Sequence, residues 1–327
     1  MVKAKVEIRA DGNAEIGLGH IYRCIALGQM LEEEFDICFW VKNPGDAIIK
    51  EIENKGFEIK AIESEQAFLE ILGRNSIVVL DGYNFDTSYQ KEIKNKGAKL
   101  VCIDDIHDKH FVADVIINHA PGVSEKDYST ESYTKFCLGL DYALLRPEFL
   151  RQASKDRNIE EVKTGLVCFG GADPKNLTER VVKELVKYEQ FNKIVAICGS
   201  GYQYIDSLNR LKAFNTSLEI KLSLNSGEML ENMLKAELAV VPASGVLYEV
   251  LACKNSIVSG YYVENQQKLY EGFKSIQAFT DAENFSEISL IKAIKKILLK
   301  GNLKSIFIDG NSNKRILDDF KRLGNEI

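Results

Sequence analysis

The sequence has no long apolar run and no excess of positive charge, and each absence argues against a class of protein. No stretch approaches the roughly 18 consecutive apolar residues that a membrane-spanning helix requires. Lysine and arginine number 42 against 48 aspartate and glutamate, a formal net charge of −6. This argues against a nucleic-acid partner, because phosphate binding needs a basic surface. No positively charged start precedes an apolar run, so we expect no signal peptide and a cytoplasmic protein.

Patterns that bind metals or form disulfides are also missing. The seven cysteines are an odd number and form no C-x-x-C pair. Several lie inside apolar runs such as 166–169, so we predict free, buried thiols. The four histidines show no H-E-x-x-H spacing. His107 and His110 could share a helix face, but a loop or surface position is the simpler interpretation. Because D-x-D is absent too, we expect no metal and no other cofactor.

What the sequence does contain is an alternation of short apolar strands and helical patterns over its whole length. The continuous apolar run 76–80 is typical of a strand covered on both faces. This alternation predicts an α/β fold with parallel strands and right-handed crossovers. The series restarts after Arg146-Pro147, and 151–163 is charged and poor in large apolar residues. We therefore predict two Rossmann-like, doubly wound domains, 1–150 and 151–327, with a groove between them.

The first loop that could carry chemistry is 9–20, in which Gly17 and Gly19 precede His20. The glycines allow a tight turn and the close approach of a ligand. G-x-G-H is neither the dinucleotide fingerprint nor a P-loop. His20 would lie at the start of a helix and face the groove, where a neutral imidazole is a competent general base for water. The alternative is a histidine that only caps the helix or hydrogen-bonds the loop.

A second loop starts at the carboxyl end of the fourth predicted strand, with Asp81-Gly-Tyr83. Ligands of such sheets bind at the carboxyl ends of the strands. Tyr83 could donate a hydrogen bond to a sugar there. Asp81 could orient a neighbouring group, or it could cap the next helix.

Two turns in the second half are suited to a diphosphate. Gly171 and Ala172 belong to a turn that offers backbone N–H groups before a helix, and Ser244 and Gly245 begin another helix. Glu249, just over one turn further on, could accept both hydroxyls of a ribose. Each feature alone could equally be an ordinary turn or a solvated helix residue.

A later loop contains Asn265 and Gln266, which could contact sugar or phosphate. Polar loop residues without such a role are equally common. Without a metal on a D-x-D pair, a departing diphosphate would be stabilised by backbone amides and helix ends.

Taken together and in this order, these loops resemble the UDP-sugar hydrolases of pseudaminic acid biosynthesis, whose substrate is UDP-2,4-diacetamido-2,4,6-trideoxy-β-L-altropyranose. The resemblance runs from Arg9 to about Gln267, most of the chain. It is carried by Arg9-Ala-Asp11, Ile16-Gly-Leu-Gly-His20 with Arg23, Asp81-Gly-Tyr83, Asp104-Asp105, Gly139-Leu-Asp-Tyr-Ala-Leu-Leu-Arg146, Phe169-Gly-Gly-Ala-Asp173, Ala243-Ser244 with Glu249, and Asn265-Gln266.

The resemblance implies a fold like that of the GT-B glycosyltransferases, with UDP held by the C-terminal domain. It implies that water, not a sugar acceptor, attacks the anomeric carbon and that the C–O bond breaks with inversion. The catalytic histidine of the family corresponds to His20 and its loop tyrosine to Tyr83. Its nucleotide-binding glutamate corresponds to Glu249 and the asparagine of the late loop to Asn265. We expect Asp11 and Tyr83 to orient the water, His20 or the sugar.

The sequence departs from the family at Gly82, where a bulkier residue is usual, and in a longer segment after about Ala278. Gly82 leaves the exact sugar substituents open. One alternative is a GT-B glycosyltransferase with an alcohol or lipid acceptor, which an exposed apolar patch would favour; the sequence shows no strong basic amphipathic helix. The other is a non-catalytic nucleotide-sugar binding protein, which would leave His20 unexplained. We expect a small-molecule UDP-sugar as the partner, neither membrane nor nucleic acid, and leave the oligomeric state open.

Overall fold

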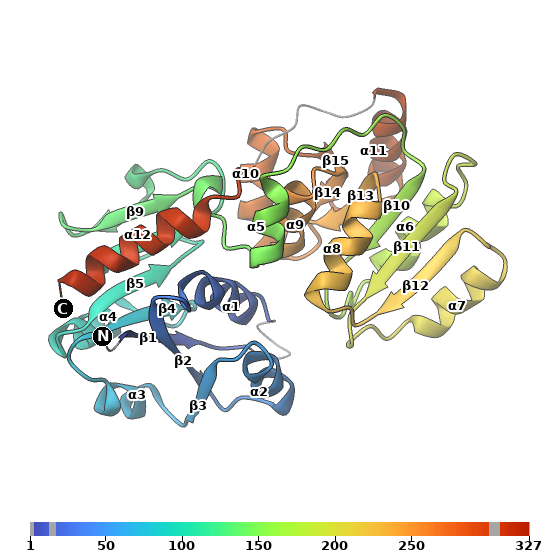
Figure 1. The fold of residues 1–327 in the computed structure, drawn as a ribbon. Coiled ribbons are helices and arrows are strands. Elements are labelled where there is room, and N and C mark those ends of the chain that lie inside the picture. Colours follow the sequence, from blue (N-terminus) through green and yellow to red (C-terminus); the bar gives the residue numbers. More distant parts are fainter. Residues whose placement is uncertain (1–2, 13–17, 301–307, 327) are drawn as a thin grey trace. The chain divides into compact units, whose positions relative to one another are not determined.

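The computed structural model describes residues 3–12, 18–300 and 308–326, and every structural statement below concerns those residues. The chain divides into two compact units, each built around its own parallel sheet (Figure 1). Unit 1 comprises Met1–Pro147 and Asn311–Ile327, and unit 2 comprises Glu148–Gly310. Both are Rossmann-like α/β domains, which confirms the doubly wound architecture predicted from the sequence.

The sheet of unit 1 has seven parallel strands in the spatial order β3-β2-β1-β4-β5-β7-β9. Their bounds are β1 (Ala4–Ala10), β2 (Phe35–Lys42), β3 (Glu58–Ile62), β4 (Ser76–Asp81), β5 (Lys99–Ile103), β7 (Val115–Asn118) and β9 (Lys135–Leu138). The helices are α1 (Gly19–Leu31), α2 (Asp46–Glu53), α3 (Glu65–Ile71), α4 (Thr87–Asn95) and α12 (Ser312–Asn325), with single turns η1 (Glu125–Asp127) and η2 (Leu140–Tyr142). All residues of β4 are buried, as its continuous apolar sequence predicts.

Side-chain caps explain where two helices of unit 1 begin. The Ser64 hydroxyl accepts a hydrogen bond from the N–H of Ala67 at 3.2 Å before α3, and the Asp86 carboxylate accepts one from Tyr89 at 2.8 Å before α4. Helix α1 differs, because Leu18 precedes it and provides no side-chain cap. Its first N–H groups therefore have no cap from that residue, and such groups attract anions and polar ligands.

The C-terminal helix α12 belongs to unit 1, which corrects the predicted assignment of all of 151–327 to the second domain. Its apolar face packs in unit 1, where Phe320 meets Phe35 at a ring separation of 6.1 Å. Asp319 of α12 forms an ion pair with Lys135 and accepts a hydrogen bond from Cys137, both on β9. The apolar face of an amphipathic helix indicates that the helix packs on a core, but not on which one. The sequence therefore could not predict that the chain returns to unit 1 at its C-terminal helix.

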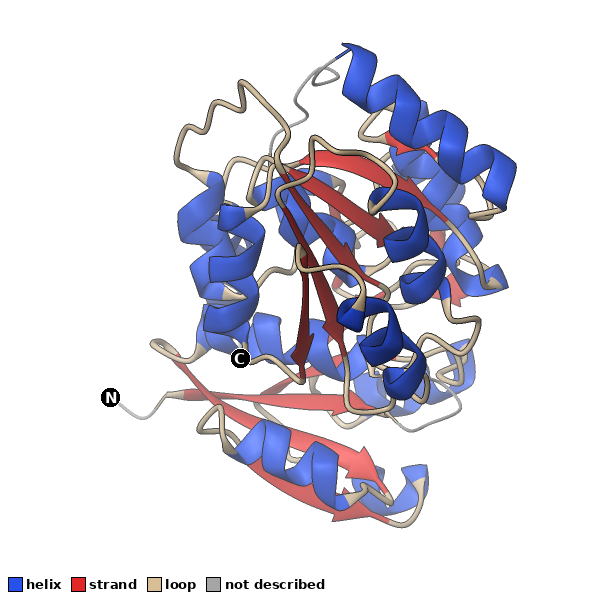
Figure 2. Ribbon diagram, turned by 90° about the vertical axis from the view of Figure 1, so that its right-hand side faces the viewer, coloured by secondary structure: helices blue, strands red, loops and turns tan. Residues whose placement is uncertain are grey.

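Unit 2 contains six parallel strands in the order β12-β11-β10-β13-β14-β15. They are β10 (Thr164–Cys168), β11 (Lys193–Cys198), β12 (Leu218–Leu222), β13 (Leu238–Pro242), β14 (Ser256–Gly260) and β15 (Thr280–Asp281). Helices α6 (Leu177–Leu185), α7 (Ile205–Ala213), α8 (Ser226–Lys235), α9 (Gly245–Ala252), α10 (Gln267–Ser275) and α11 (Glu287–Lys300), the turn η3 (Glu264–Gln266) and the entering helix α5 (Pro147–Ala153) complete it. Figure 2 shows helices on both sides of the strands.

The strand orders place the candidate loops at one kind of position in both units. In unit 1 the first strand, β1, lies beside the fourth, β4, and in unit 2 β10 lies beside β13 in the same way. Successive crossovers leave such a pair in opposite directions, which opens a crevice at the carboxyl ends of the two strands, the usual ligand position in doubly wound sheets. His20 follows β1 and Asp81 ends β4; Gly171 follows β10 and Ser244 follows β13.

His107 and His110 lie in other segments of unit 1. His107 lies in a loop with φ of 41°, and His110 lies in β6 (His110–Phe111), which pairs with β8 (Ser129–Thr130). The two therefore share no helix face, and within the described ranges no group of three or more potential metal ligands occurs. All seven cysteines are buried, and none of them forms a disulfide. Among the helices that the structure describes, none is long and apolar enough to cross a membrane.

Arg157, in the charged stretch that leads into unit 2, is a structural residue that the sequence did not single out. Its guanidinium donates hydrogen bonds to backbone carbonyls at the ends of α8 and α9, which have no partner within their own helices. The accepting carbonyls are those of Leu234 at 2.8 Å, Ala236 at 2.6 Å, Cys253 at 2.8 Å and Met233 at 3.3 Å. One side chain thus ties the connection to two helices of unit 2.

We expect Arg157→Met to lower the free energy of unfolding of unit 2 by about 2–4 kcal/mol. The carbonyls of Leu234 and Cys253 would lose their side-chain donor, whereas those of Met233 and Ala236 would keep the amide of Asn255. Urea denaturation followed by circular dichroism measures the change. The matched control is Arg210→Met at an exposed position of α7, where a change within about 0.5 kcal/mol is expected. Equal effects of the two substitutions would contradict the role of Arg157.

Candidate active site

His20 is fixed at the start of α1 by a carboxylate from β4. The side chain is buried, and its Nδ1 lies 2.6 Å from Oδ1 of Asp81. Nη2 of Arg23, which can only donate, lies 3.0 Å from the same nitrogen. The shorter contact is the one to Asp81, whose ionised carboxylate only accepts hydrogen bonds, so we assign the ring proton to Nδ1 and the lone pair to Nε2. A histidine held in this way by a buried aspartate has the arrangement of a general base.

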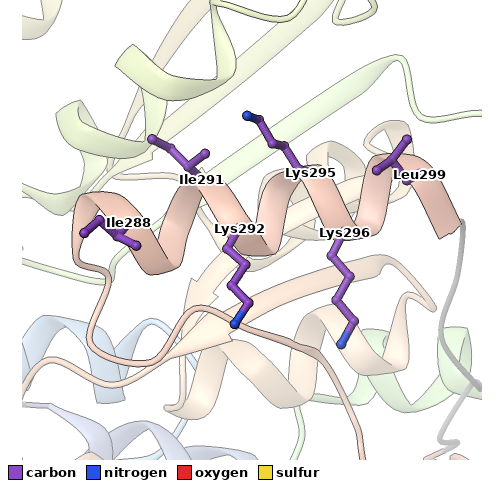
Figure 3. A pocket seen from close by; sticks show the side chains of 6 residues that line it. All are labelled: Ile288, Ile291, Lys292, Lys295, Lys296 and Leu299. Carbon is purple, nitrogen blue, oxygen red and sulfur yellow. The ribbon is translucent and has the colours of Figure 1, made fainter.

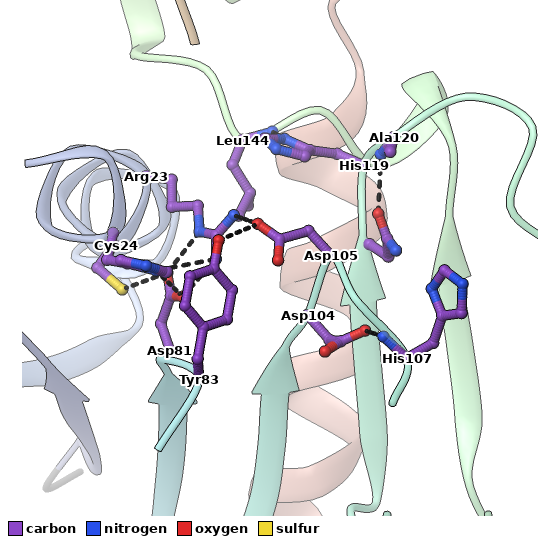
Figure 4. A network of polar contacts seen from close by, with 12 residues as sticks. Arg23, Cys24, Asp81, Tyr83, Asp104, Asp105, His107, His119, Ala120 and Leu144 are labelled. Atoms are coloured by element: carbon purple, nitrogen blue, oxygen red, sulfur yellow. Dashed lines mark hydrogen bonds and ion pairs between the residues drawn. The ribbon is translucent and has the colours of Figure 1, made fainter. Parts of the chain in front are cut away.

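Arg23 keeps that aspartate ionised. It lies one turn after His20 on α1, and its Nε and Nη2 donate to the two carboxylate oxygens of Asp81 at 2.6 and 2.5 Å. Burial alone would raise the pKa of Asp81, but the charge and hydrogen bonds of Arg23 hold it well below its usual range. Cys24 adds a weak thiol hydrogen bond at 3.4 Å. Figure 4 shows Arg23, Cys24 and Asp81 side by side.

Tyr83 lies beside the imidazole of His20, and its side chain is half exposed. Its ring meets that of His20 edge-on, with centroids 5.0 Å apart, and its hydroxyl donates to Oδ2 of Asp105 at 3.3 Å. The same oxygen accepts from Nη1 of Arg23 at 2.9 Å. Burial and the charge of Asp105 raise the pKa of Tyr83 to about 12, so the hydroxyl stays protonated and able to donate. The structure thus brings the predicted pair His20 and Tyr83 together.

A second histidine, His119, lies next to this network and was not singled out by the sequence. It follows β7, and its Nδ1 accepts the backbone N–H of Leu144 at 3.1 Å (Figure 4). Burial, reinforced by the charge of Arg23, lowers its pKa to about 3. The ring is therefore neutral at ordinary pH with its proton on Nε2. The only sequence signal was its position at the carboxyl end of an apolar run.

Asp11 lies in a different network from the one expected. Both of its oxygens accept from the fully buried Arg9, at 2.6 and 2.7 Å, and Oδ1 also accepts the N–H of Lys42 at 2.9 Å. Glu65 binds the other edge of the same guanidinium at 2.6 and 2.9 Å. Among the described contacts none joins Asp11 to His20, and Asp81 occupies the orienting position instead. Asp11 therefore supports the carboxyl end of β1.

The glycines of the first loop are placed only in part. Gly17 lies outside the described residues. Gly19 is the first residue of α1 and is exposed, and a Cβ added there would meet no atom within 4 Å. Among the described residues, none therefore fills the space beside Gly19 at the start of α1.

In unit 2 the turn after β10 is held open by backbone packing. Gly170 has φ of 81°, a conformation that favours glycine, and Gly171 and Ala172 are exposed. A Cβ on Gly199, in the loop after β11, would lie only 2.5 Å from Cα of Gly171. The two backbones are therefore in direct contact. Asp173 is buried and accepts the first N–H groups of α6 at 2.7 and 2.9 Å, so that helix end is already occupied by a side chain.

The turn after β13 is different, because its helix end is uncapped. Ser244 precedes α9 but makes no side-chain cap hydrogen bond, and Gly245 is exposed. The first N–H groups of α9 are available to an anion such as a phosphate. Glu249 is half-buried about one turn further along, where the sequence placed it.

The late loop separates its two predicted residues. Asn265 is exposed in η3, whereas Gln266 is buried and its Oε1 accepts the N–H of Tyr262 at 3.1 Å. Lys175 donates to the carbonyl of the same tyrosine at 2.5 Å. Gln266 therefore shapes the loop, and Asn265 is the residue of the pair that is open to a ligand.

Sequence comparison identifies relatives that include a UDP-sugar hydrolase and a spore coat polysaccharide biosynthesis protein. No protein-family model matches the chain. It is 29% identical to an uncharacterized protein of Methanocaldococcus jannaschii, over 99% of this chain and 70% of that protein. It is 27% identical to the UDP-2,4-diacetamido-2,4,6-trideoxy-β-L-altropyranose hydrolase of Campylobacter jejuni, over 80% of this chain and 93% of the hydrolase. A spore coat polysaccharide biosynthesis protein of Bacillus subtilis is 25% identical over 75% of this chain and 74% of its own length.

Solved structures with the same fold include a putative UDP-N-acetylglucosamine 2-epimerase and a UDP-glucosyltransferase. MurG of Acinetobacter baumannii superimposes with a TM-score of 0.66 at 12% identity, covering 98% of this chain and 99% of that one. MnaA of Staphylococcus aureus in complex with UDP superimposes with a TM-score of 0.64 at 10% identity, covering 99% of this chain and 98% of that one. A UDP-glucosyltransferase of Polygonum tinctorium superimposes with a TM-score of 0.59 at 10% identity, covering 99% of this chain and 94% of that one. At these identities the likeness shows the fold alone: the chain has the fold of the GT-B glycosyltransferases and sugar-nucleotide epimerases, and its sequence relatives include a UDP-sugar hydrolase.

Proposed function

We propose that this protein hydrolyses UDP-2,4-diacetamido-2,4,6-trideoxy-β-L-altropyranose by attack of water on the anomeric carbon, with inversion. The observation that carries the proposal is the geometry at the switch point of unit 1, where Asp81 and Arg23 hold His20 with Nε2 as its basic nitrogen. The Campylobacter relative bearing the name of this hydrolase supports the choice of substrate.

The chemical step is assigned to groups of unit 1. Nε2 of His20 takes a proton from water while the water oxygen bonds to C1 of the sugar. The C1–O bond breaks, and its electron pair leaves with the diphosphate of UDP. Asp81 stabilises the imidazolium that forms, and the hydroxyl of Tyr83 donates a hydrogen bond to the sugar. Asp11 acts on the reaction only through the shape of the β1 end.

The nucleotide end of the substrate is assigned to unit 2. The backbone N–H groups of Gly171 and Ala172 and those at the uncapped start of α9, at Ser244 and Gly245, would donate hydrogen bonds to the diphosphate. Glu249 would accept the ribose hydroxyls, and Asn265 would contact the substrate from the late loop. These fixed dipoles also stabilise the charge that develops on departing UDP, so no step requires a metal ion.

The decisive experiment is a single incubation with this UDP-sugar in ¹⁸O-labelled water with EDTA present. Label in the sugar and none in UDP is expected, because water attacks carbon. Proton NMR of the first product formed should show the inverted anomer. Label in the phosphate of UDP would mean P–O cleavage and contradict the mechanism, and the absence of any product would contradict the activity.

Transfer to an acceptor is the second candidate, because glycosyltransferases are among the structural neighbours. The same incubation separates the two. A hydrolase releases the free sugar at a rate that added alcohols do not change, whereas a transferase releases UDP efficiently only when an acceptor is present.

The close contact behind the Gly171 turn predicts a defect in nucleotide binding alone. An alanine at Gly199 would need the backbone of Gly171 to move, since its Cβ would lie 2.5 Å from Cα and carbonyl oxygen. We expect Gly199→Ala to weaken UDP binding at least about tenfold, about 1.4 kcal/mol, by isothermal titration calorimetry. In the control Gly227→Ala, the nearest atom to the added Cβ is Oδ1 of Asn225 at 3.4 Å, and affinity should not change. Wild-type affinity in Gly199→Ala would exclude this turn from the UDP site.

A further inference from the structure

Helix α11 carries a surface that neither the proposed reaction nor the core of unit 2 uses. Its inner side packs into the core through Leu290, Ala293, Ile294 and Ile297. Its outer side, which we call the α11 face, consists of Ile288, Ile291, Lys292, Lys295, Lys296 and Leu299. Figure 3 shows these side chains projecting from one helix.

The aliphatic side chains of the α11 face protrude unusually far. Ile288 is 81% exposed and Leu299 is 86% exposed. They lie at the two ends of the helix, roughly 16 Å apart along its axis at 1.5 Å per residue. Single exposed apolar residues are common on soluble proteins. Two on one helix, with half-buried Ile291 and three lysines between them, form a mixed apolar and basic surface.

The positive charge of this surface is not neutralised within the described residues. Lys292, Lys295 and Lys296 are exposed and form no ion pair there, and Glu287 is the acidic residue of the helix. In and just after the neighbouring helix α6 the lysines are paired, Lys183 with Glu179 and Lys187 with Glu184, each at 2.6 Å. The α11 face is therefore a local excess of positive charge on a chain whose net charge is −6.

We propose that the α11 face docks unit 2 onto an anionic phospholipid surface. Lysine ammonium groups pair with headgroup phosphates, and the protruding tips of Ile288 and Leu299 enter between headgroups, a combination typical of helices that lie on a membrane. A second copy of the chain would bring two sets of unpaired lysines together. A protein partner would need a preformed pocket for each protruding side chain, whereas a lipid surface accommodates both without one.

The test is co-sedimentation of the full chain with vesicles of phosphatidylcholine alone or mixed with phosphatidylglycerol. We expect binding to the anionic vesicles only, weakened by raising salt from 0.1 to 0.5 M because the charges are exposed. Each lysine is expected to contribute about fivefold, the equivalent of about 1 kcal/mol. Replacing all three lysines of the face by glutamine should therefore lower the partition coefficient by about 10²-fold, and the double variant Ile288→Ser with Leu299→Ser should lower it at both salt concentrations.

The matched control is Lys212→Gln with Phe214→Ser at the end of α7 in the same unit, where Phe214 follows the helix and is 89% exposed. It should bind like the wild type, and thermal melts should show all variants folded. Failure of the wild type to bind anionic vesicles, undiminished binding by the triple variant, or an equal loss in the control would each overturn the proposal. A cross-linker attached at Ile288→Cys that captures a protein, with no lipid binding, would assign the face to a protein partner instead. None of these readouts depends on hydrolysis, so the proposed function is judged separately.

Discussion

Replacing His20 by asparagine should lower kcat by about 10²–10⁴-fold, the usual contribution of a general base. This substitution is chosen because it keeps a hydrogen-bond donor to Asp81. The amide nitrogen of asparagine can take the place of Nδ1 and donate to Asp81, which lies 2.6 Å from Nδ1 in the wild type. Only the basic Nε2 is lost, so the structure around Asp81 and Arg23 should be preserved. Steady-state hydrolysis of the UDP-sugar measures the effect.

Binding of UDP should be unchanged in the same variant, because the elements assigned to the nucleotide lie in unit 2. Calorimetric titration with UDP provides that comparison. His110→Asn is the control, since His110 contacts Ser129 and Glu131 on the surface and its loss should leave kcat within about twofold. Turnover of the His20 variant within fivefold of the wild type would remove this residue from the mechanism and favour a role in loop structure.

Replacing Asp81 by asparagine should damage both turnover and stability. An asparagine can donate its amide N–H to Nδ1 of His20, which would move the ring proton to Nε2 and abolish the base. We therefore expect a fall in kcat of about 10³–10⁴-fold, as in other triads with the wrong tautomer. In addition, Arg23 would lose its buried counter-charge, and removal of one partner of a buried ion pair costs about 3–5 kcal/mol. Urea denaturation of the wild type and the Asp81→Asn variant measures the difference in their free energies of unfolding.

The stability difference should depend on pH with a definite sign. The pKa of Asp81 is lower in the folded protein than the value of about 3.9 in an unfolded chain. Its contribution is therefore fully present above about pH 4 and is lost as pH falls through the folded pKa. The gap between the wild type and the Asp81→Asn variant should be constant from pH 5 to 7 and shrink below pH 4.

Asp105→Asn is the matched control for this pair. Asp105 also binds Arg23, at 2.9 Å, but its side chain is 31% exposed, and exposed pairs contribute about 1 kcal/mol or less. A much smaller loss of stability is expected. If Asp81→Asn and Asp105→Asn proved equally mild, the buried pair would not hold the site together.

Local features of the sequence were sufficient for most elements of the fold. The apolar run 76–80 is β4, and the restart near 165 is β10, because a strand covered on both faces needs continuous apolar residues whatever surrounds it. His20 and Tyr83 could be selected as candidates because each follows a predicted strand. The burial of Gln266 could not be predicted, since a polar loop residue has the same sequence signature whether it contacts a ligand or its own loop.

The sequence also could not predict which apolar side chains of α11 are exposed. The segment that forms α11 reads as a core helix with lysines, and the sequence showed no strong basic amphipathic helix. Only the packing of Leu290, Ile294 and neighbours into unit 2 reveals that Ile288 and Leu299 remain outside. Which of several apolar residues face the core depends on the partner elements.

The sequence by itself determined the alternation of strands and helices, the doubly wound class and the loops in which chemistry could occur, because these depend on residues close together along the chain. Tertiary structure decided the pairings: His20 with Asp81 across 61 positions, Asp11 with the buried Arg9 rather than with the imidazole, and α12 with unit 1 rather than unit 2. An ionisable side chain takes the partner that burial leaves within reach, and only the folded chain fixes which partner that is.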